Sequence, residues 1–530
     1  MSQHVAENNV SHRRENSGKS QQLQVGKHRL FLGVGALIMS TARLNVEDGV
    51  FFLAFDVKQR GRSTGFANIL KEASMRFLPS ISLGIVLCVV LGQSNDIQAG
   101  WKAGLAKTVI TPKQPMWMAG YGGRTGPSEG AEHDLYVRVL ALEDDHGHRG
   151  IVLSSDTLGI PQSIADDLAR RLKDKFGLER SQLVLHASHT HCGPVLRGAL
   201  YDAYPLDEVQ IERINTYSDW LTDEIVSTIG KALQDLKPAT LSRGQGYADF
   251  AVNRRTNREP DVPKLREQNL LFGPVDHTVP VLAIRAMDGT LRAAVFAYAC
   301  HNTTLSYMKF CGDYAGFAQF DLEQRHPGAM ALFCMGCGAD QNPLPRRTVE
   351  LAQSYGKRLS AAVDTVLASP MENVEPFLKT HHELVPLKMH GLPKTEVLRK
   401  MAAGQPDYQQ RWAARMLDLS ANGAVPDEYP YPITAWKLGK DQLWITLGGE
   451  VVVDFSLRLK GEYGERTWVT AYSNDVMAYI PSRRVLMEGG YEGQSSMMVY
   501  GLPTERWADD VEDRVVQVVQ RCVEMVSVKK

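Results

Sequence analysis

The sequence has no excess of charge of either sign. Its 530 residues include 59 Lys and Arg against 60 Asp and Glu, which gives a formal net charge of −1. Nucleic-acid-binding proteins normally carry an excess of basic residues, so we expect no nucleic-acid partner. The apolar content of 44% is that of an ordinary globular chain, long enough for one large domain or two of moderate size.

The sequence contains few cysteines, and their positions do not indicate which of them could form a disulfide. One of the seven cysteines, Cys88, lies in an apolar stretch near the N-terminus. Cys334-Met-Gly-Cys337 has the spacing of a redox or metal site, but the sequence has no second such pair. We therefore do not expect a zinc site built from four thiolates. We expect the six remaining cysteines to be buried small residues or to include one disulfide.

The first apolar run, residues 30–39, is shorter than the roughly 20 residues that a membrane-spanning helix needs. Met75-Arg76, the apolar block 77–92 and the small-residue exit at 97–99 instead resemble the three parts of a secretory signal. We therefore expect residues 1–74 to be absent from the mature chain or disordered, residues 75–99 to be a signal peptide, and the exported chain to be periplasmic or secreted. An uncleaved anchor or a buried helix is the alternative.

From residue 100 onwards, short apolar runs alternate with amphipathic stretches. This alternation predicts an α/β fold, with mixed sheets flanked by helices. No repeat, heptad pattern or Gly/Ser linker interrupts residues 100–530, which we treat as one domain. The predicted strands are 150–154, 183–187, 294–299, 330–334, 443–447 and 468–471. The predicted helices are 164–176, 211–233, 349–367, 396–419 and 451–463.

Four polar, glycine-containing segments come directly after predicted strands. They are 188–194, 300–304, 336–343 and 448–450. Ligands of open α/β sheets bind outside the carboxyl ends of the strands. We therefore expect the four segments to converge on one site at one end of a sheet.

The first of these segments contains His189-Thr-His191. In extended backbone, residues two apart point to the same side, and imidazole is a common zinc ligand. A pair of hydrogen-bonded histidines in a turn is the alternative interpretation. His301 and Glu450 allow the same two interpretations, since His301 could be a buried core histidine and Glu450 could cap a helix.

As an ordered set, these motifs resemble the neutral/alkaline non-lysosomal ceramidase family. The resemblance covers roughly residues 101–500 and ends where the family's C-terminal sandwich domain would begin, so we expect this chain to lack that domain. The matching segments are His189-Thr-His-Cys-Gly-Pro194, Cys300-His301, Gly449-Glu450, Tyr479-Ile-Pro-Ser482 and Tyr491-Glu492.

The resemblance implies a role for each matching residue. His189, His301, Glu450 and Tyr479 would bind Zn2+ and leave room for a water molecule. The substrate's polar head and the developing oxyanion would be contacted by His191, Arg254 and Tyr491. The reaction would be hydrolysis of the N-acyl bond of a ceramide-like lipid by zinc-activated water, with peripheral contact to a membrane.

One position departs from the family pattern. The family carries a Gly-Asp-Val-Ser-Pro-Asn loop whose serine lies near the zinc, whereas this chain has Ala339-Asp340-Gln-Asn342-Pro343. Asp340 keeps its place, but an amide at Asn342 cannot act as the nucleophile. Two alternatives follow from this departure: a zinc hydrolase of another amide or an ester, and an exported binding protein without activity.

Overall fold

The computed structural model describes residues 40–47, 50–57 and 100–527. It divides into two units, of which the first contains an antiparallel hairpin of β1 (Ser40–Glu47) and β2 (Val50–Val57). The predicted signal segment, 75–99, lies outside the described residues. No helix in the described part of the chain is long and apolar enough to cross a membrane.

The second unit is built around a nine-stranded sheet with the order β11-β10-β9-β7-β3-β4-β5-β6, in which β13 pairs with β7. Only β10–β11 and β5–β6 are parallel along this path. The strands are β3 (Trp101–Val109), β4 (Tyr136–Glu143), β5 (Arg149–Ser155), β6 (Leu183–Ala187), β7 (Lys237–Tyr247), β9 (Thr278–Ala286), β10 (Leu291–Tyr298), β11 (Met330–Met335) and β13 (Glu372–Val374).

A second sheet has four strands in the order β14-β15-β16-β18, namely β14 (Leu378–Lys388), β15 (Glu428–Leu438), β16 (Gln442–Leu447) and β18 (Trp468–Thr470). The faces that the two sheets turn towards each other share one apolar core, which includes Trp101, Trp436, Trp444 and Trp468. Two short pairs complete the strands: β8 (Ala251–Asn253) with β12 (Gln341–Pro343), and β17 (Glu450–Val451) with β19 (Tyr479–Ile480).

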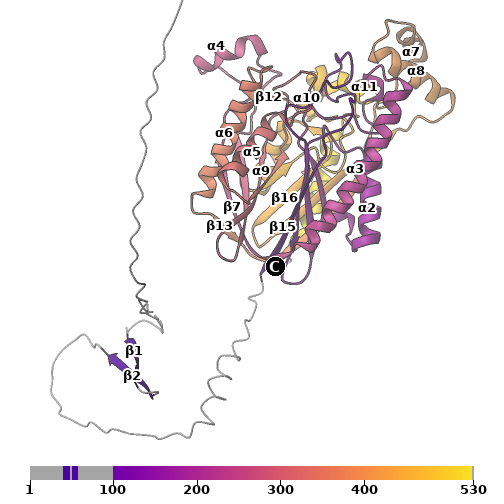
Figure 1. The fold of residues 1–530 in the computed structure, drawn as a ribbon. Helices are drawn as coiled ribbons and strands as arrows, with labels where there is room; N and C mark the ends of the chain where they lie inside the picture. The colour runs from indigo at the N-terminus through magenta and orange to yellow at the C-terminus, as the bar shows by residue number, and fades with distance from the viewer. Residues whose placement is uncertain (1–39, 48–49, 58–99, 528–530) are drawn as a thin grey trace, which may run out of the picture. The chain divides into compact units, whose positions relative to one another are not determined.

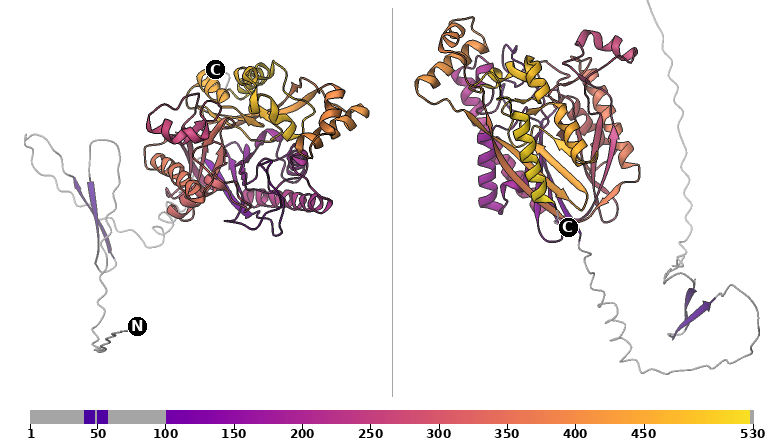
Figure 2. Two further views of the ribbon diagram at one scale, coloured as in Figure 1. Left: turned by 90° about the horizontal axis from the view of Figure 1, so that it is seen from above. Right: turned by 180° about the vertical axis from the view of Figure 1, so that it is seen from behind.

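Helices cover the outer face of each sheet (Figure 1). On the larger sheet, α3 (Glu208–Gln234) packs on β3 and β4 and is flanked by α2 (Gln162–Phe176), while α5 (Asp313–Arg325) and α6 (Val349–Leu367) pack on the β11 side. On the smaller sheet, α9 (Val453–Tyr463) contacts β18, and α12 (Val511–Val526), yellow in the rear view of Figure 2, packs on β14 and β15. The remaining helices are α4 (Val262–Glu267), α7 (Thr395–Ala402), α8 (Tyr408–Ala421), α10 (Arg483–Glu488) and α11 (Ser496–Tyr500), with short 3-10 or π turns at 180–182, 201–203, 259–261 and 491–495.

The predicted α/β class with mixed sheets and flanking helices is confirmed, and two details are corrected. The helix expected over 396–419 is two helices, α7 and α8, separated by a segment that contains Gly404 and Pro406, because proline cannot continue a helix. The polar segments follow strands of two sheets, since β6, β10 and β11 belong to the larger sheet and β16 to the smaller. The six cysteines after residue 100 are buried and free, with no disulfide in the described residues, which agrees with their prediction as buried small residues.

Candidate metal centre

Three of the four polar segments bring a nitrogen or oxygen ligand to one point. His189 comes from the loop after β6, His301 from the loop after β10, and Glu450 from β17, just after β16. The two Nε2 atoms are 3.2 Å apart, and Glu450 Oε2 lies 3.1 Å from that of His189 and 3.0 Å from that of His301. All three side chains are buried.

Backbone carbonyls fix the orientation of both imidazoles. His189 Nδ1 lies 2.7 Å from the carbonyl oxygen of Leu158, and His301 Nδ1 lies 2.9 Å from that of Gly338. A carbonyl oxygen can only accept, so each Nδ1 carries the hydrogen and donates it. The Nε2 lone pairs of the neutral rings therefore face each other and the carboxylate. These groups repel one another unless a proton or cation lies between them.

This arrangement fits a zinc ion. Zinc–nitrogen bonds of about 2.0–2.1 Å in tetrahedral geometry place two ligand atoms about 3.3 Å apart, close to the 3.2 Å between the imidazole nitrogens. Metal-binding histidines usually donate their other ring N–H to a carbonyl or carboxylate, as His189 and His301 do here.

Tyr479 joins the group through a strand pair. In the parallel pair of β17 with β19, Tyr479 lies directly beside Glu450. Its hydroxyl oxygen is 3.3 Å from His301 Nε2, and Arg254 Nη2 donates to that oxygen at 3.2 Å. Glu450 therefore lies in a strand and faces the imidazoles, while helix α9 begins only at Val453. The helix-capping interpretation of Glu450 is wrong.

The backbone is specialised where it forms this centre. His189 has a positive φ of 58°, a conformation that costs energy in a non-glycine residue and is typical of functional sites. Gly449 has a φ of +69°, and a Cβ there would lie 2.7 Å from the carbonyl oxygen of Ala478. The Gly-Gly pair before Glu450 therefore allows the close approach that brings Glu450 beside Tyr479.

His191 lies at the edge of the same group. Its Nε2 is 3.2 Å from that of His189, and its Nδ1 has no hydrogen-bond partner among the described residues. A Cβ at Gly120 would lie 2.4 Å from Cγ of the His191 ring, so only glycine fits there. The nitrogens of His189, His191 and His301 are close enough together for one ion.

Burial and mutual contact set the protonation states. Burial raises the pKa of Glu450, but His189 and His301 outweigh burial and hold that pKa well below its usual range. Burial and Arg254 lower the pKa of His301 to about 4 despite the carboxylate. Burial and Glu450 raise the pKa of the Tyr479 phenol, against the effect of Arg254. An ionised carboxylate beside a neutral His301 imidazole is a donor set for a divalent cation.

Arg254 connects this centre to the residues around it. Its Nε donates to Glu492 Oε1 at 2.7 Å, and its Nη1 donates to Asn342 Oδ1 at 3.3 Å. The ring of Tyr491 is centred 5.9 Å from the guanidinium carbon. Arg254, Asn342 and Tyr491 therefore form one wall beside the metal ligands.

Asp340 is placed behind this wall. Its carboxylate accepts from the backbone N–H of Val453 at 2.9 Å and from Asn253 Nδ2 at 3.0 Å. Its carbonyl oxygen accepts from the backbone N–H of Arg254 at 2.9 Å. These contacts make Asp340 a residue that positions Arg254 and the start of α9.

Sequence reasoning missed Tyr500 at the end of α11. Its hydroxyl donates a short hydrogen bond to Glu450 Oε1, the oxygen that does not face the imidazoles. The hydroxyl of Tyr472 lies 3.5 Å from the other oxygen. The stretch around Tyr500 carried no recognisable motif, so only the fold reveals this contact.

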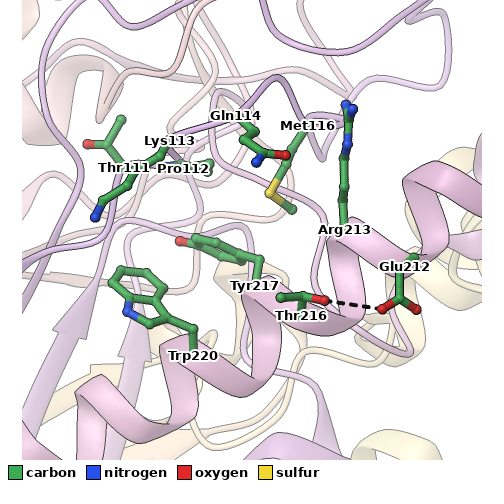
Figure 3. Close-up of a pocket in the computed structure, with 10 residues that line it drawn as sticks. All are labelled: Thr111, Pro112, Lys113, Gln114, Met116, Glu212, Arg213, Thr216, Tyr217 and Trp220. Carbon is green, nitrogen blue, oxygen red and sulfur yellow. Dashed lines mark hydrogen bonds between the residues drawn. The ribbon is translucent and has the colours of Figure 1, made fainter.

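A separate cavity of about 390 Å³ lies along α3 (Figure 3). Met116, Tyr217 and Trp220 give it an apolar wall, and no residue of the metal centre lines it. Its Arg213 donates from Nη1 to the carbonyl oxygen of Pro115 at 3.0 Å. This cavity therefore shares no lining residue with the metal centre.

Two sheets between helices, with histidines and a carboxylate gathered at strand ends, characterise an α/β protein with a candidate metal site. Residues 101–340 match the family model described as neutral/alkaline non-lysosomal ceramidase, N-terminal. This match over residues 101–340 bears out the family that the sequence motifs predicted.

Two curated relatives come from Dictyostelium discoideum. Neutral ceramidase A is 25% identical over 275 residues, which are 50% of this chain and 37% of the relative. Neutral ceramidase B is 26% identical over 219 residues, which are 40% of this chain and 30% of the relative. The matches thus span only about a third of the length of each relative.

Solved structures share the fold. Neutral ceramidase from Pseudomonas aeruginosa superposes with a TM-score of 0.62 at 19% identity, covering 82% of this chain and 76% of that one. A ceramidase complexed with C2 gives a TM-score of 0.60 at 18% identity, covering 82% and 77%. At this identity, the likeness establishes the fold.

Proposed function

We propose that this protein is an exported zinc-dependent hydrolase that cleaves an N-acyl bond of ceramide type, with His189, His301, Glu450 and Tyr479 as metal ligands. The observation that carries the proposal is the pair of Nε2 atoms 3.2 Å apart beside Glu450 Oε2. The match to the ceramidase family model supports the amide bond as the target. A lipid substrate would bring the protein into peripheral contact with a membrane.

When bound, zinc would lower the pKa of water towards ~7 and polarise the substrate carbonyl. Arg254 and the Tyr491 hydroxyl would stabilise negative charge that develops on the carbonyl oxygen. The pKa of His191 is lowered mainly by burial, and further by the electrostatic effect of His189 and His301. A neutral His191 ring can contact the polar head and accept a proton at Nε2.

Because Asn342 stands where the family has a serine, we keep a second candidate function, the hydrolysis of another amide or of an ester. Its side-chain oxygen already accepts from Arg254 Nη1, and an amide is not a nucleophile. We assign Asn342 to the positioning of Arg254. A binding protein without activity is the least favoured candidate, because every expected metal ligand is present at the centre.

Metal analysis followed by a substrate panel separates these candidates. The purified chain is stripped with a chelator, reloaded with zinc, and assayed against an N-acylsphingosine, other N-acyl amides and matched esters. Turnover of amides that depends on zinc supports the first candidate, and turnover of esters alone supports the second. Zinc binding without turnover of any substrate would support the third candidate, a binding protein without activity.

A further inference from the structure

A cavity of about 550 Å³ lies beside the metal centre, and its lining includes Arg254, Asn342 and Tyr491. Arg254 links this lining to the centre, because its Nη2 donates to the Tyr479 hydroxyl at 3.2 Å. Four of the thirteen lining residues are arginines, three are glutamates and two are asparagines, whereas Leu344 is the only aliphatic one. The side chain of Leu344 is itself buried. The part of a substrate that occupies this cavity therefore meets charged and amide groups.

Existing ion pairs neutralise the glutamates of this cavity. Glu492 accepts from Arg254 Nε at 2.7 Å and from Arg255 Nη1 at 2.6 Å. Glu488 lies 3.0 Å from Arg255 Nη2. Each carboxylate is thus held by a guanidinium on the cavity wall.

On the other side of the cavity, one guanidinium is paired with a glutamate and one is not. Arg346 donates to Glu259 Oε2 from Nε at 3.0 Å and from Nη2 at 2.9 Å. Arg258 is exposed, and its guanidinium forms no ion pair within the described part of the chain. The lining arginines outnumber the lining glutamates by one, so the field at the opening attracts an anion.

We propose that this cavity binds an anionic group on the head of the substrate, a carboxylate or a phosphate ester, with Arg258 and Arg346 as its main contacts. This inference rests on the proposed hydrolase function. Guanidinium groups match both anions with paired N–H donors, whereas a hydrocarbon chain here would desolvate arginines without replacing their hydrogen bonds.

The test uses two matched pairs of short-chain probes. N-hexanoylglycine is compared with N-hexanoylglycinamide, and N-hexanoylethanolamine phosphate with N-hexanoylethanolamine. We expect kcat/KM of the zinc-loaded protein to favour the anionic member at least about tenfold. The pair with the larger ratio identifies the anion as carboxylate or phosphate.

Three variants test the named residues. Arg258→Gln should lower the anionic-to-neutral ratio about threefold, because an exposed ion pair contributes modestly. Glu259→Gln should raise the ratio, since it frees Arg346. Arg170→Gln, on the exposed face of α2 away from the cavity, removes the same charge and should leave the ratio unchanged.

Calorimetric binding of the same four probes is measured in parallel, so the inference can be tested without turnover. If no probe is hydrolysed but the anionic members bind more tightly through Arg258, the cavity assignment stands and the proposed hydrolysis of such amides fails. Equal affinity for charged and neutral members, or an Arg258→Gln ratio equal to that of the unmodified protein, would overturn the inference.

Discussion

The second unit contains two groups of potential metal ligands, and their difference shows what a metal centre requires beyond residue type. His189, His191 and His301 form one group, and His381, Glu383 and Cys522 form the other. The second group joins β14 to α12 at the edge of the smaller sheet. Histidine, carboxylate and thiolate are all good zinc ligands, so composition alone would favour neither group.

The surroundings separate the two groups. His381 and Glu383 are about 30% exposed, and their nearest nitrogen and oxygen are 3.9 Å apart. Glu383 also forms an ion pair with Arg521, which competes with a cation. The first group is buried, and carbonyls orient the rings of His189 and His301. Orientation by neighbouring groups tunes affinity, so we expect metal at the first group alone.

The largest effect should come from removing a ligand of the first group. His301→Ala should weaken zinc binding by at least about a hundredfold, since even the loss of an orienting neighbour costs 10–100-fold. Hydrolytic activity should disappear while the protein still folds. Cys522→Ser, which also alters a buried residue, should keep one equivalent of zinc. Metal titration and circular dichroism check both variants; loss of zinc in Cys522→Ser alone would reverse the assignment.

A smaller effect should follow from Tyr500→Phe. The variant removes the hydroxyl that donates to Glu450 Oε1, so the carboxylate is less well oriented and zinc affinity should fall about tenfold. Tyr217→Phe is the matched control, because it removes a buried phenolic hydrogen bond to the carbonyl of Ile110. Both variants should lose about 1 kcal/mol of unfolding free energy. Equal zinc affinity in the two variants would refute the role of Tyr500.

Asn342→Ala should keep zinc and lose activity severalfold. The variant removes the acceptor for Arg254 Nη1, while the hydrogen bonds of Arg254 to Glu492 and Tyr479 remain. Zinc content and kcat/KM are measured on the same preparation. If Asn342→Ala abolished metal binding, the placement of this loop beside the ligands would be wrong.

Burial, which distinguishes the first group, also predicts a pH dependence in β6, the strand that precedes His189. His186 is fully buried, with Nδ1 2.7 Å from Ser473 Oγ, and burial lowers its pKa from 6.5 to about 3. Between these values the unfolded chain binds a proton that the folded chain does not. The contribution of His186 to the unfolding free energy therefore falls on acidification, by up to about 1.4 kcal/mol per pH unit.

His186→Gln should flatten this slope between pH 6 and pH 4 by up to about 1.4 kcal/mol per pH unit. Urea unfolding of the metal-free protein at a series of pH values measures the slope. An identical slope in the variant would show that His186 is not the group that titrates.

The sequence predicted the elements with strong periodicity and the residues that carry motifs. Helix α6 was predicted with both of its ends. The sequence motifs identified His189, His301, Glu450 and Tyr479, which lie far apart in the chain. The antiparallel strands β7, β14 and β15 were missed, because charged residues, prolines or glycines interrupt their apolar residues. Tyr500 and the carbonyls of Leu158 and Gly338 were also missed, since a carbonyl has no sequence signature and the contact of Tyr500 depends on tertiary packing.

The most direct test is anomalous diffraction at the zinc edge from crystals of the zinc-loaded protein. We predict one peak within about 2.1 Å of the Nε2 atoms of both His189 and His301, in contact with Glu450 and Tyr479. A peak at Cys522 with none between the two histidines would contradict the account.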